Sequence, residues 1–360
     1  MNDGFRLYAV SRLVTVSETL LLFFMLLTLT GWTYAQGDGS IDNIQVSQRT
    51  GEEERVVDIA FTLSGGDYYA IKLGIKFHED DEYTPIDTDE IIDLDPAHII
   101  DEHLDETIEG AIILAHGDVE LTWDGRESFA EIDAAAARVE ITATRGMRDI
   151  DGNFYKSVII GDQEWMAENL RVTSNANGNN ITRYCYNNNT TNCELYGGLY
   201  TWEIVMNGEN SSSSNPSDVQ GICPDGWHVP SDAEWTELVN YVVSQGFPNA
   251  ENNSNGAGNA LKSCRQDDSP LAGCNTSEHP RWDSDGTHHG FDEVGFSALP
   301  GGYRDTNESF VDIGLYGYWW SSTEGSTAEV WLRRIAYFYG DVYRYDHYKS
   351  YGFSLRCVRD

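Results

Sequence analysis

The six cysteines are the side chains with the clearest chemistry in this 360-residue chain, and all of them follow residue 180. No two are spaced as C-x-x-C, the pattern of zinc sites and thioredoxin-type redox motifs. An even number of cysteines in an exported chain predicts disulfides. Two pairs of cysteines enclose short polar loops. The remaining two cysteines would close a long loop, and of the three disulfides this one would lower the entropy of the unfolded chain the most. The predicted disulfides are Cys185–Cys193, Cys264–Cys274 and Cys223–Cys357.

Carboxylates are the second group of candidate ligands. The chain has 59 acidic and 23 basic side chains, a formal net charge of −36, with the densest acidic run from His78 to Glu106. Carboxylate oxygens bind Ca²⁺, but neither this run nor "DIDGNFY" has EF-hand spacing, and a solvated surface or a hairpin turn also explains them. Calcium is the only cofactor considered, with Asp149, Asp151, Asp87 and Asp89 as candidate ligands. The negative charge argues against nucleic-acid binding, which needs a basic face.

Residues that could act in catalysis do not form a recognisable group. His228 in "CPDGWHVPS" is interpreted as a hydrogen-bonded structural histidine. Ser297 lacks the second glycine of the G-x-S-x-G elbow, so we predict that it lies in a core strand. His288 and His289 are adjacent and would point apart on a strand, without a third spaced metal ligand. The sequence therefore predicts a protein that is not an enzyme.

An aromatic segment near the C-terminus is the candidate binding surface. Tyrosine combines a rigid apolar face with a hydroxyl group, which suits recognition at low entropic cost, and aromatic faces also stack on sugar rings. Ordinary packing beside a solvated loop remains an alternative for the same residues. The predicted ligand-binding residues are Trp320, Arg333, Tyr337, Tyr339, Tyr343, Tyr345 and Asp346.

The N-terminal residues 1–35 are expected to form a signal peptide. An apolar run, Leu20–Thr30, follows Arg6 and Arg12 and precedes a small-residue cleavage site that ends at Ala35. The run is too short to span a bilayer, and no second apolar segment of membrane length occurs. We expect the mature protein to be secreted or held at the cell surface, with no transmembrane span. An uncleaved anchor is the alternative.

Residues 36–146 are predicted to form an all-β domain. "VVDIAFTLSGGDYYAIKLGIKF" contains two alternating runs separated by Gly-Gly, which predicts a hairpin. Other short alternating runs follow, so we expect an immunoglobulin-like sandwich, here without the inter-sheet disulfide. A spacer is its simplest role.

The composition changes near "TRGMRDIDGNFY" to Trp, Tyr, Gly, Asn and Cys. In the remaining residues, "SDAEWTELVNYVVSQG" is the clearest helix, with a capping box from Ser231 and Glu234 and an end at Gly246. Trp235, Leu238, Val239 and Val242 share its apolar face. Short strands and long polar loops elsewhere indicate an α+β domain.

Ordered motifs through residues 149–360 resemble one known family. They include "DIDGNFYKSVIIGDQEWMAENLRVT", "YGGLYTWEIVMNG", "GICPDGWHVPSDAEW", "GFSALPGGYRD", "YGYWWSSTE" and "KSYGFSLRCVRD". This segment is similar to the Fibrobacter succinogenes major paralogous domain of exported bacterial proteins. The resemblance implies a C-type-lectin-like fold, related to that of formylglycine-generating enzymes, in which the last strand lies inside the sheet. It implies little about activity, because most members have no established one.

Three functions follow as hypotheses. The first is an exported binding or adhesion protein in which the lectin-like module recognises an extracellular glycan or protein. The second is a structural envelope protein without a discrete ligand. The third is an enzyme on a formylglycine-related scaffold, although a shared fold does not carry a reaction with it. The tyrosine-rich segment before the fixed "GFSLRC" end also resembles the diversified segments of some lectin-like domains.

Overall fold

The computed structural model describes residues 5–10, 40–49, 55–76, 83–92, 111–126, 128 and 138–359. The chain divides into two compact units, Asn2–Met147 and Arg148–Asp360, and each is described by itself. The apolar run Leu20–Thr30 and the cleavage site at Ala35 lie outside the described residues, as does most of the acidic run. Strand β1 (Phe5–Val10) lies within the predicted signal peptide and pairs with β7 (Arg138–Arg148).

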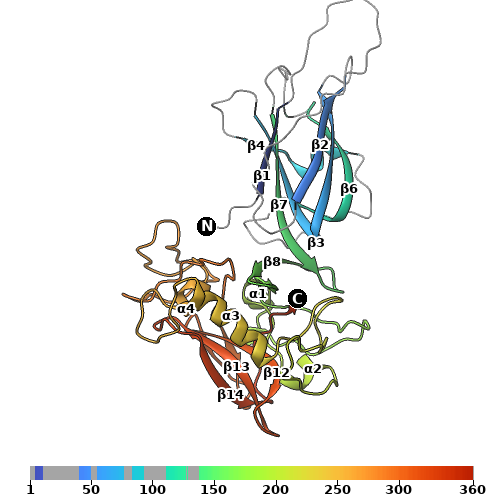
Figure 1. Ribbon diagram of the computed structural model, residues 1–360. Helices are drawn as coiled ribbons and strands as arrows, with labels where there is room; N and C mark the ends of the chain where they lie inside the picture. The colour runs from blue at the N-terminus through green and yellow to red at the C-terminus, as the bar shows by residue number, and fades with distance from the viewer. Residues whose placement is uncertain are drawn as a thin grey trace, which may run out of the picture. The chain divides into compact units, whose positions relative to one another are not determined.

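The N-terminal unit is an antiparallel sheet built around one long strand, β3 (Val56–Lys76). The first half of β3 pairs with β2 (Ser40–Gln48), its second half pairs with β7, and β6 (Ile112–Asp124) pairs with both halves (Figure 1). Two short strands, β4 (Thr84–Pro85) and β5 (Ile91–Ile92), extend the sheet around the 3-10 helix η2 (Thr88–Glu90). The prediction of a β-rich unit before the second domain is confirmed, whereas the immunoglobulin-like topology remains a prediction.

The predicted hairpin at the Gly-Gly pair is wrong. β3 runs through Gly65 and Gly66 without turning back, and its two halves pair with other strands rather than with each other. The register with β6 shifts between Leu63 and Tyr68, and Gly65 has a φ of 92°, so the pair forms a bulge. The Tyr69 hydroxyl donates to the Ser64 carbonyl at 2.6 Å, which holds this bend in place. The bend allows both halves of β3 to contribute alternate apolar side chains to one core.

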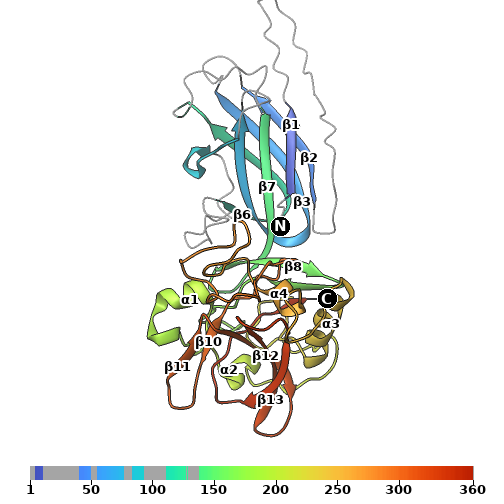
Figure 2. The same cartoon turned by 90° about the vertical axis from the view of Figure 1, so that its left-hand side faces the viewer.

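The C-terminal unit contains two small sheets and a hairpin. Strands β8 (Phe154–Ile160), β9 (Gln163–Met166) and β15 (Val358–Arg359) form the first sheet in the order β15–β9–β8. Strands β12 (Tyr316–Glu324), β13 (Glu329–Ala336) and β14 (Tyr343–Tyr348) form the second in chain order. Figure 2 shows β10 (Gly301–Arg304) and β11 (Phe310–Ile313) as a hairpin next to β12.

Helix α3 (Asp232–Ser244) packs against β12 and β13 (Figure 1). Its capping box is present as predicted: Ser231 Oγ accepts from the Glu234 N–H at 3.2 Å, and Glu234 accepts from the Ser231 N–H at 2.7 Å. The buried face of α3 places Trp235 against Trp165, with ring centroids 4.7 Å apart, and near Trp319 at 6.3 Å. The other helices are short: α1 (Thr190–Tyr196), α2 (Trp202–Met206), α4 (Ala257–Leu261) and the 3-10 turn η3 (Tyr186–Asn188).

A buried arginine, Arg356, fixes the last residues of the chain in the centre of this unit. Its guanidinium donates to the carbonyls of Phe296, Ser297 (2.8 Å) and Met166 (3.3 Å), and to Asn169 Oδ1 at 2.9 Å. Burial lowers the pKa of Arg356 to about 9, so the group stays charged at neutral pH. The last strand, β15, has only two residues, and the segment before it makes only isolated bridges.

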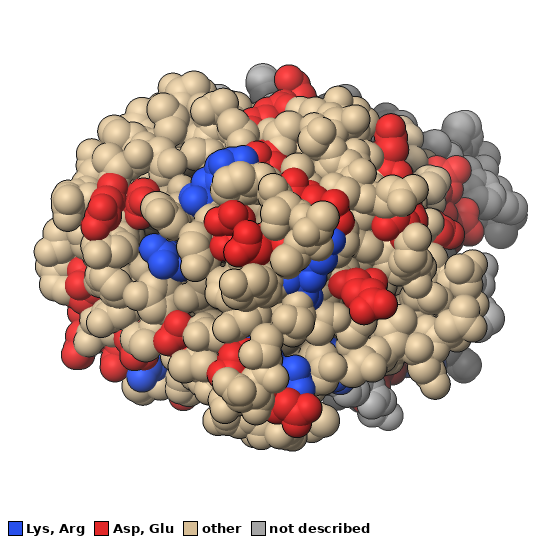
Figure 3. All heavy atoms as spheres, turned by 90° about the horizontal axis from the view of Figure 1, so that it is seen from below, with Lys and Arg blue, Asp and Glu red and all other residues tan. Residues whose placement is uncertain are grey.

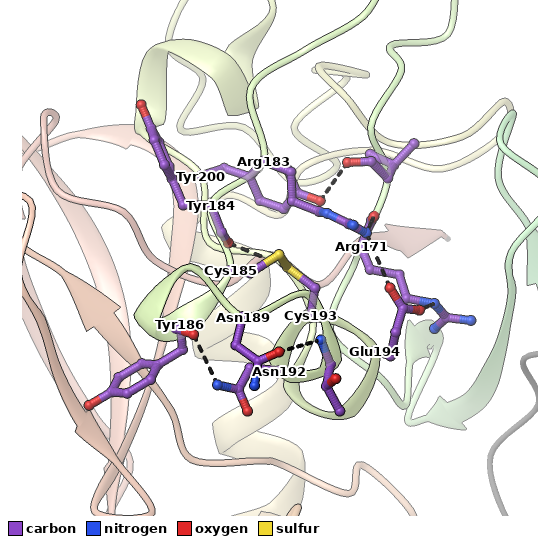
Figure 4. The surroundings of a disulfide bond; sticks show 12 residues. Arg171, Arg183, Tyr184, Cys185, Tyr186, Asn189, Asn192, Cys193, Glu194 and Tyr200 are labelled. Carbon is purple, nitrogen blue, oxygen red and sulfur yellow. Dashed lines mark hydrogen bonds and ion pairs between the residues drawn. A yellow bond between two sulfur atoms is a disulfide. The ribbon is translucent and has the colours of Figure 1, made fainter.

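The structure joins the cysteines in the three predicted pairs. Cys223–Cys357 ties the chain end to the segment before α3, with Cα atoms 5.9 Å apart. Cys185–Cys193 closes the loop that enters α1, where Asn189 caps the helix by accepting from the Thr191 N–H (Figure 4). Cys264–Cys274 closes the third loop. Loop length predicted the pairing correctly, because once the two short loops are assigned to disulfides, only one long-range pair of cysteines remains.

Removing the long-range disulfide should cost more stability than removing a local one. The loop-entropy relation gives about 5 kcal/mol for the pair Cys223→Ala/Cys357→Ala and about 2.5 kcal/mol for Cys185→Ala/Cys193→Ala, because the first closes the much longer loop. Urea unfolding of both double variants measures the difference. Equal losses in the two variants would contradict the proposed role of the chain end.

Lys262 should make stability depend on pH. Its ammonium is fully buried and donates to the carbonyls of Tyr337 (3.1 Å) and Tyr339 (3.0 Å). Burial lowers the pKa of Lys262 to about 7, against the opposing effect of Asp285 and Asp341. Between pH 7 and pH 10 the unfolded chain therefore binds the proton that the folded chain has lost, so the free energy of unfolding rises with pH, by up to about 1.4 kcal/mol per unit.

Urea unfolding at pH 7, 8 and 9 measures this slope, with Lys262→Met as the control. The variant should lose the rise because it has no titrating group at this position. The same slope in both proteins would show that Lys262 does not cause it.

Candidate functional site

The predicted binding segment forms one edge of the β12–β13–β14 sheet. Cross-strand pairing places Arg334 between Tyr318 on β12 and Tyr343 on β14. In the next row on the same face, Leu332 lies between Trp320 and Tyr345. We call the accessible part of this face the tyrosine patch, which consists of Tyr316, Arg334, Tyr343, Tyr345 and His347.

Two tyrosines of the patch are open to solvent. Tyr343 is 46% exposed and Tyr345 is 37% exposed, and their ring centroids lie 6.2 Å apart. His347 lies 5.6 Å beyond Tyr345, and burial lowers its pKa, so the imidazole is neutral at neutral pH. The patch therefore offers adjacent aromatic rings, with Arg334 as its basic side chain and Asp312 beside Tyr318.

A buried aromatic layer supports the patch from below. Phe353, from the chain end, stacks on Tyr318 at 5.1 Å and meets Trp320 edge-on at 4.7 Å. Tyr303 on β10 contacts both Tyr318 and Phe353, at 5.4 and 5.8 Å. Since this layer packs on several elements, the exposed rings stand on a fixed base rather than on a loop.

Two of the predicted ligand-binding residues are structural instead. Trp320 is 0% exposed, and its indole N–H donates to the Tyr200 carbonyl at 2.8 Å. Arg333 is 2% exposed and lies on the opposite face of β13, where it donates to Asp232 at 2.7 Å and to Thr236 at 2.9 Å. Strand alternation explains the correction for Arg333, since neighbouring residues of one strand face opposite sides of the sheet. Trp320 lies on the same face as Tyr345, but Phe353 packs against it.

The other predicted residues border the patch. Tyr337 and Tyr339 lie in the connection between β13 and β14, where their carbonyls hold Lys262. Asp346 is half-buried and pairs with Trp331 on the face opposite to Tyr345. On that face Arg344 stacks 3.3 Å from the centre of the Trp331 ring and forms an ion pair with Asp232 at 2.9 Å.

The calcium candidates accept hydrogen bonds from the protein. Asp149 accepts from Asn153 N and Nδ2, at 2.9 and 2.7 Å, and from the Tyr155 hydroxyl at 2.6 Å. Asp151 accepts from the N–H and hydroxyl of Thr173. Asp87 caps η2 by accepting from the Asp89 N–H at 3.1 Å. Within the described ranges, no cluster of three His, Cys, Asp or Glu side chains converges as a metal site.

The residues considered for catalysis have structural partners. His228 Nε2 hydrogen-bonds Glu234 of the capping box at 2.5 Å, which matches the structural role predicted for it. Ser297 lies in an irregular segment with a φ of 51°, not in the predicted strand, and its N–H and hydroxyl donate to the half-buried Asp292. Burial raises the pKa of Asp292. His288 is buried, and its carbonyl accepts from Lys262 Nζ at 3.5 Å, whereas Nδ1 of His289 is buried without a hydrogen-bond partner.

Sequence reasoning missed a groove of about 670 Å³ beside the start of α2. Its aromatic rings are already covered by cations: Lys349 Nζ lies 4.4 Å from the ring centre of Trp202, and Arg304 lies 4.2 Å from that of Tyr184. Both cations also have acidic partners, Glu324 and Glu308. Trp202 in "YGGLYTWEIVMNG" is the sequence feature that could have indicated the groove, but only the fold brings this residue next to Lys349. Figure 3 shows acidic side chains spread over this end of the molecule, with basic ones beside several of them.

Two aromatic residues in the same cross-strand row should respond differently to truncation. Trp320→Ala should lower the free energy of unfolding by about 3–5 kcal/mol, because it empties a buried site and removes one of the two donors to the Tyr200 carbonyl. Tyr345→Ala should cost less than about 1 kcal/mol, since its ring is partly solvated. Thermal and urea unfolding measure both. A large loss in Tyr345→Ala would show that the patch is part of the core.

The comparisons with known proteins agree with the motifs. The model of the Fibrobacter succinogenes major domain matches residues 158–359, which include all six cysteines and both small sheets except the first residues of β8. Neither a curated protein nor a solved structure is significantly similar to the chain. Among the helices that the structure describes, none has the length and apolar composition needed to cross a membrane. The match covers more than half of the chain, so the protein belongs to the Fibrobacter succinogenes major domain family.

Proposed function

We propose that this chain is an extracytoplasmic binding protein that recognises a glycan through the tyrosine patch. The observation that carries the proposal is the pair of exposed rings, Tyr343 and Tyr345, on a buried aromatic base. Aromatic rings stack on the C–H face of a sugar ring, and the tyrosine hydroxyls add hydrogen bonds at little entropic cost. A fixed base favours affinity because no loop has to be ordered on binding.

The patch is a better glycan site than the groove. In the groove, Lys349 and Arg304 already occupy the faces of the two aromatic rings, and a ligand would have to displace them. In the patch, Arg334 also lies over one ring, that of Tyr343, but Tyr343 and Tyr345 remain 46% and 37% exposed, whereas Trp202 is 7% exposed. A substitution in the groove therefore serves as the control for substitutions in the patch.

Three disulfides in one unit support a location outside the cytoplasm, where such bonds persist. The predicted signal peptide points to the same location. Of the alternatives, a structural envelope protein would not need exposed aromatic rings on a rigid base. An enzyme on a formylglycine-related scaffold would need free active-site cysteines, whereas all six cysteines of this chain are in disulfides.

A glycan array with residues 36–360 tests the proposal. The wild-type protein should bind a defined set of glycans. The double variant Tyr343→Ala/Tyr345→Ala should bind the best of these glycans at least about tenfold more weakly, which is the loss of affinity expected from one or two stacking contacts. Glu203→Gln is the matched control, because this exposed residue lines the groove and not the patch. It should bind like the wild type.

Two results would overturn the proposal. Loss of binding in Glu203→Gln but not in the tyrosine variant would move the site to the groove. A folded wild-type protein that binds no glycan would contradict a carbohydrate ligand, and binding to a protein partner through the same tyrosines would replace it.

A further inference from the structure

We infer that Arg334 gives the tyrosine patch a subsite for the carboxylate of an acidic sugar, a uronic acid unit within a polysaccharide. The inference rests on the proposed function and names the ligand class of the same site. It depends on the unusual surroundings of this one arginine.

Arg334 is the arginine of the family domain that lacks a polar partner. Residues 158–359 contain ten arginines, and the side chains of the other nine form ion pairs or donate hydrogen bonds. The Arg334 side chain does neither, and its Nε atom is buried without an acceptor. In a chain with 59 acidic side chains, an unpaired guanidinium on a binding surface is a notable exception.

Two tyrosine rings fix the position of the guanidinium. Arg334 Cζ lies 5.3 Å from the ring centre of Tyr316 and 4.8 Å from that of Tyr343. These cation–π contacts hold the planar group while leaving its N–H donors without acceptors. The neighbouring arginines of the sheet, Arg333 and Arg344, are instead neutralised by Asp232 on the other face. The positive charge of the patch therefore comes from Arg334.

Two acidic side chains, Asp312 and Asp341, interact electrostatically with Arg334, but neither forms an ion pair with it in the described structure. Asp312 accepts from the Tyr318 hydroxyl at 3.2 Å, and burial raises the pKa of its carboxyl group, with Arg334 acting in the opposite direction. No ion pair joins Asp312 to Arg334 in the described structure. The guanidinium fork is thus free to bind a carboxylate through two parallel hydrogen bonds.

The spacing fits a sugar that carries its own carboxylate. A uronic acid has its carboxylate attached directly to the pyranose ring. When that ring stacks on Tyr343, Arg334 is within reach, because the ring centre and the guanidinium carbon are 4.8 Å apart. The adjacent Tyr345, 6.2 Å from Tyr343, is placed to contact the next part of the chain. One surface would then read both the sugar ring and its charge.

Calorimetric titration of residues 36–360 with matched ligands tests the inference. Oligogalacturonate and oligomannuronate carry the carboxylate, and their methyl esters keep the sugar but remove the charge. The wild type should bind one of the acids at least about tenfold more tightly than its ester, as expected for one charge-assisted contact. Arg334→Gln should remove that preference without weakening the ester, and Arg334→Lys should keep only part of it because lysine lacks the fork.

Arg304→Gln is the control, since it removes an arginine of the same unit that lies in the groove. It should retain the preference for the acid. Thermal unfolding should show that Arg334→Gln folds normally, because no ion pair is lost.

Equal binding of acid and ester, or a preference unchanged in Arg334→Gln, would overturn the inference while leaving a glycan-binding patch in place. Preference for a sulfated glycan over every uronate would overturn it too. If neither acid nor ester binds while the array shows a neutral glycan bound through the tyrosines, the ligand class is wrong and the proposed function stands. If no glycan binds in either experiment, both fail.

Discussion

The Arg356 guanidinium is the interaction on which the C-terminal unit depends. It lies three residues before Arg359, yet it is fully buried and donates to Met166 of β9, to the carbonyls of Phe296 and Ser297, and to Asn169. Asn169 Oδ1 also accepts from the Trp319 indole at 2.7 Å, so one amide oxygen links the chain end to β12. A buried charge of this kind is stable only when its donors are satisfied, which makes the order of these segments interdependent.

The chain end connects this interior to the proposed binding surface. Leu355 and Cys357 accept from the N–H groups of Leu170 and Met166, and the disulfide to Cys223 fixes the same segment covalently. Phe353, at the start of the segment, forms the base under the tyrosine patch. The apolar residues of this segment, Phe353, Leu355 and Val358, are part of the core, and the exposed tyrosines are as fixed as the segment that supports them.

Local signals in the sequence predicted the features that depend on a few neighbouring residues. The capping box of α3 and the three disulfides are of this kind. The hairpin at Gly65 failed because a glycine pair permits a bulge as well as a turn, and only the partner strand β6 decides between them. Arg333 and Arg334 are adjacent, and alternation alone does not say which of them faces the helix. Asp232, distant in sequence, determines that Arg333 does. The groove likewise depends on Trp202 and Lys349 meeting across the fold.

Native-state hydrogen exchange tests the central claim, that the chain end is an interior element which holds the unit together. The amide protons of Leu170, Phe353 and Val358, which donate across this segment, should exchange only through global unfolding, with a common free energy. They should be as protected as the amides of α3. Exchange of Phe353 and Val358 through local fraying, with α3 still protected, would contradict the account.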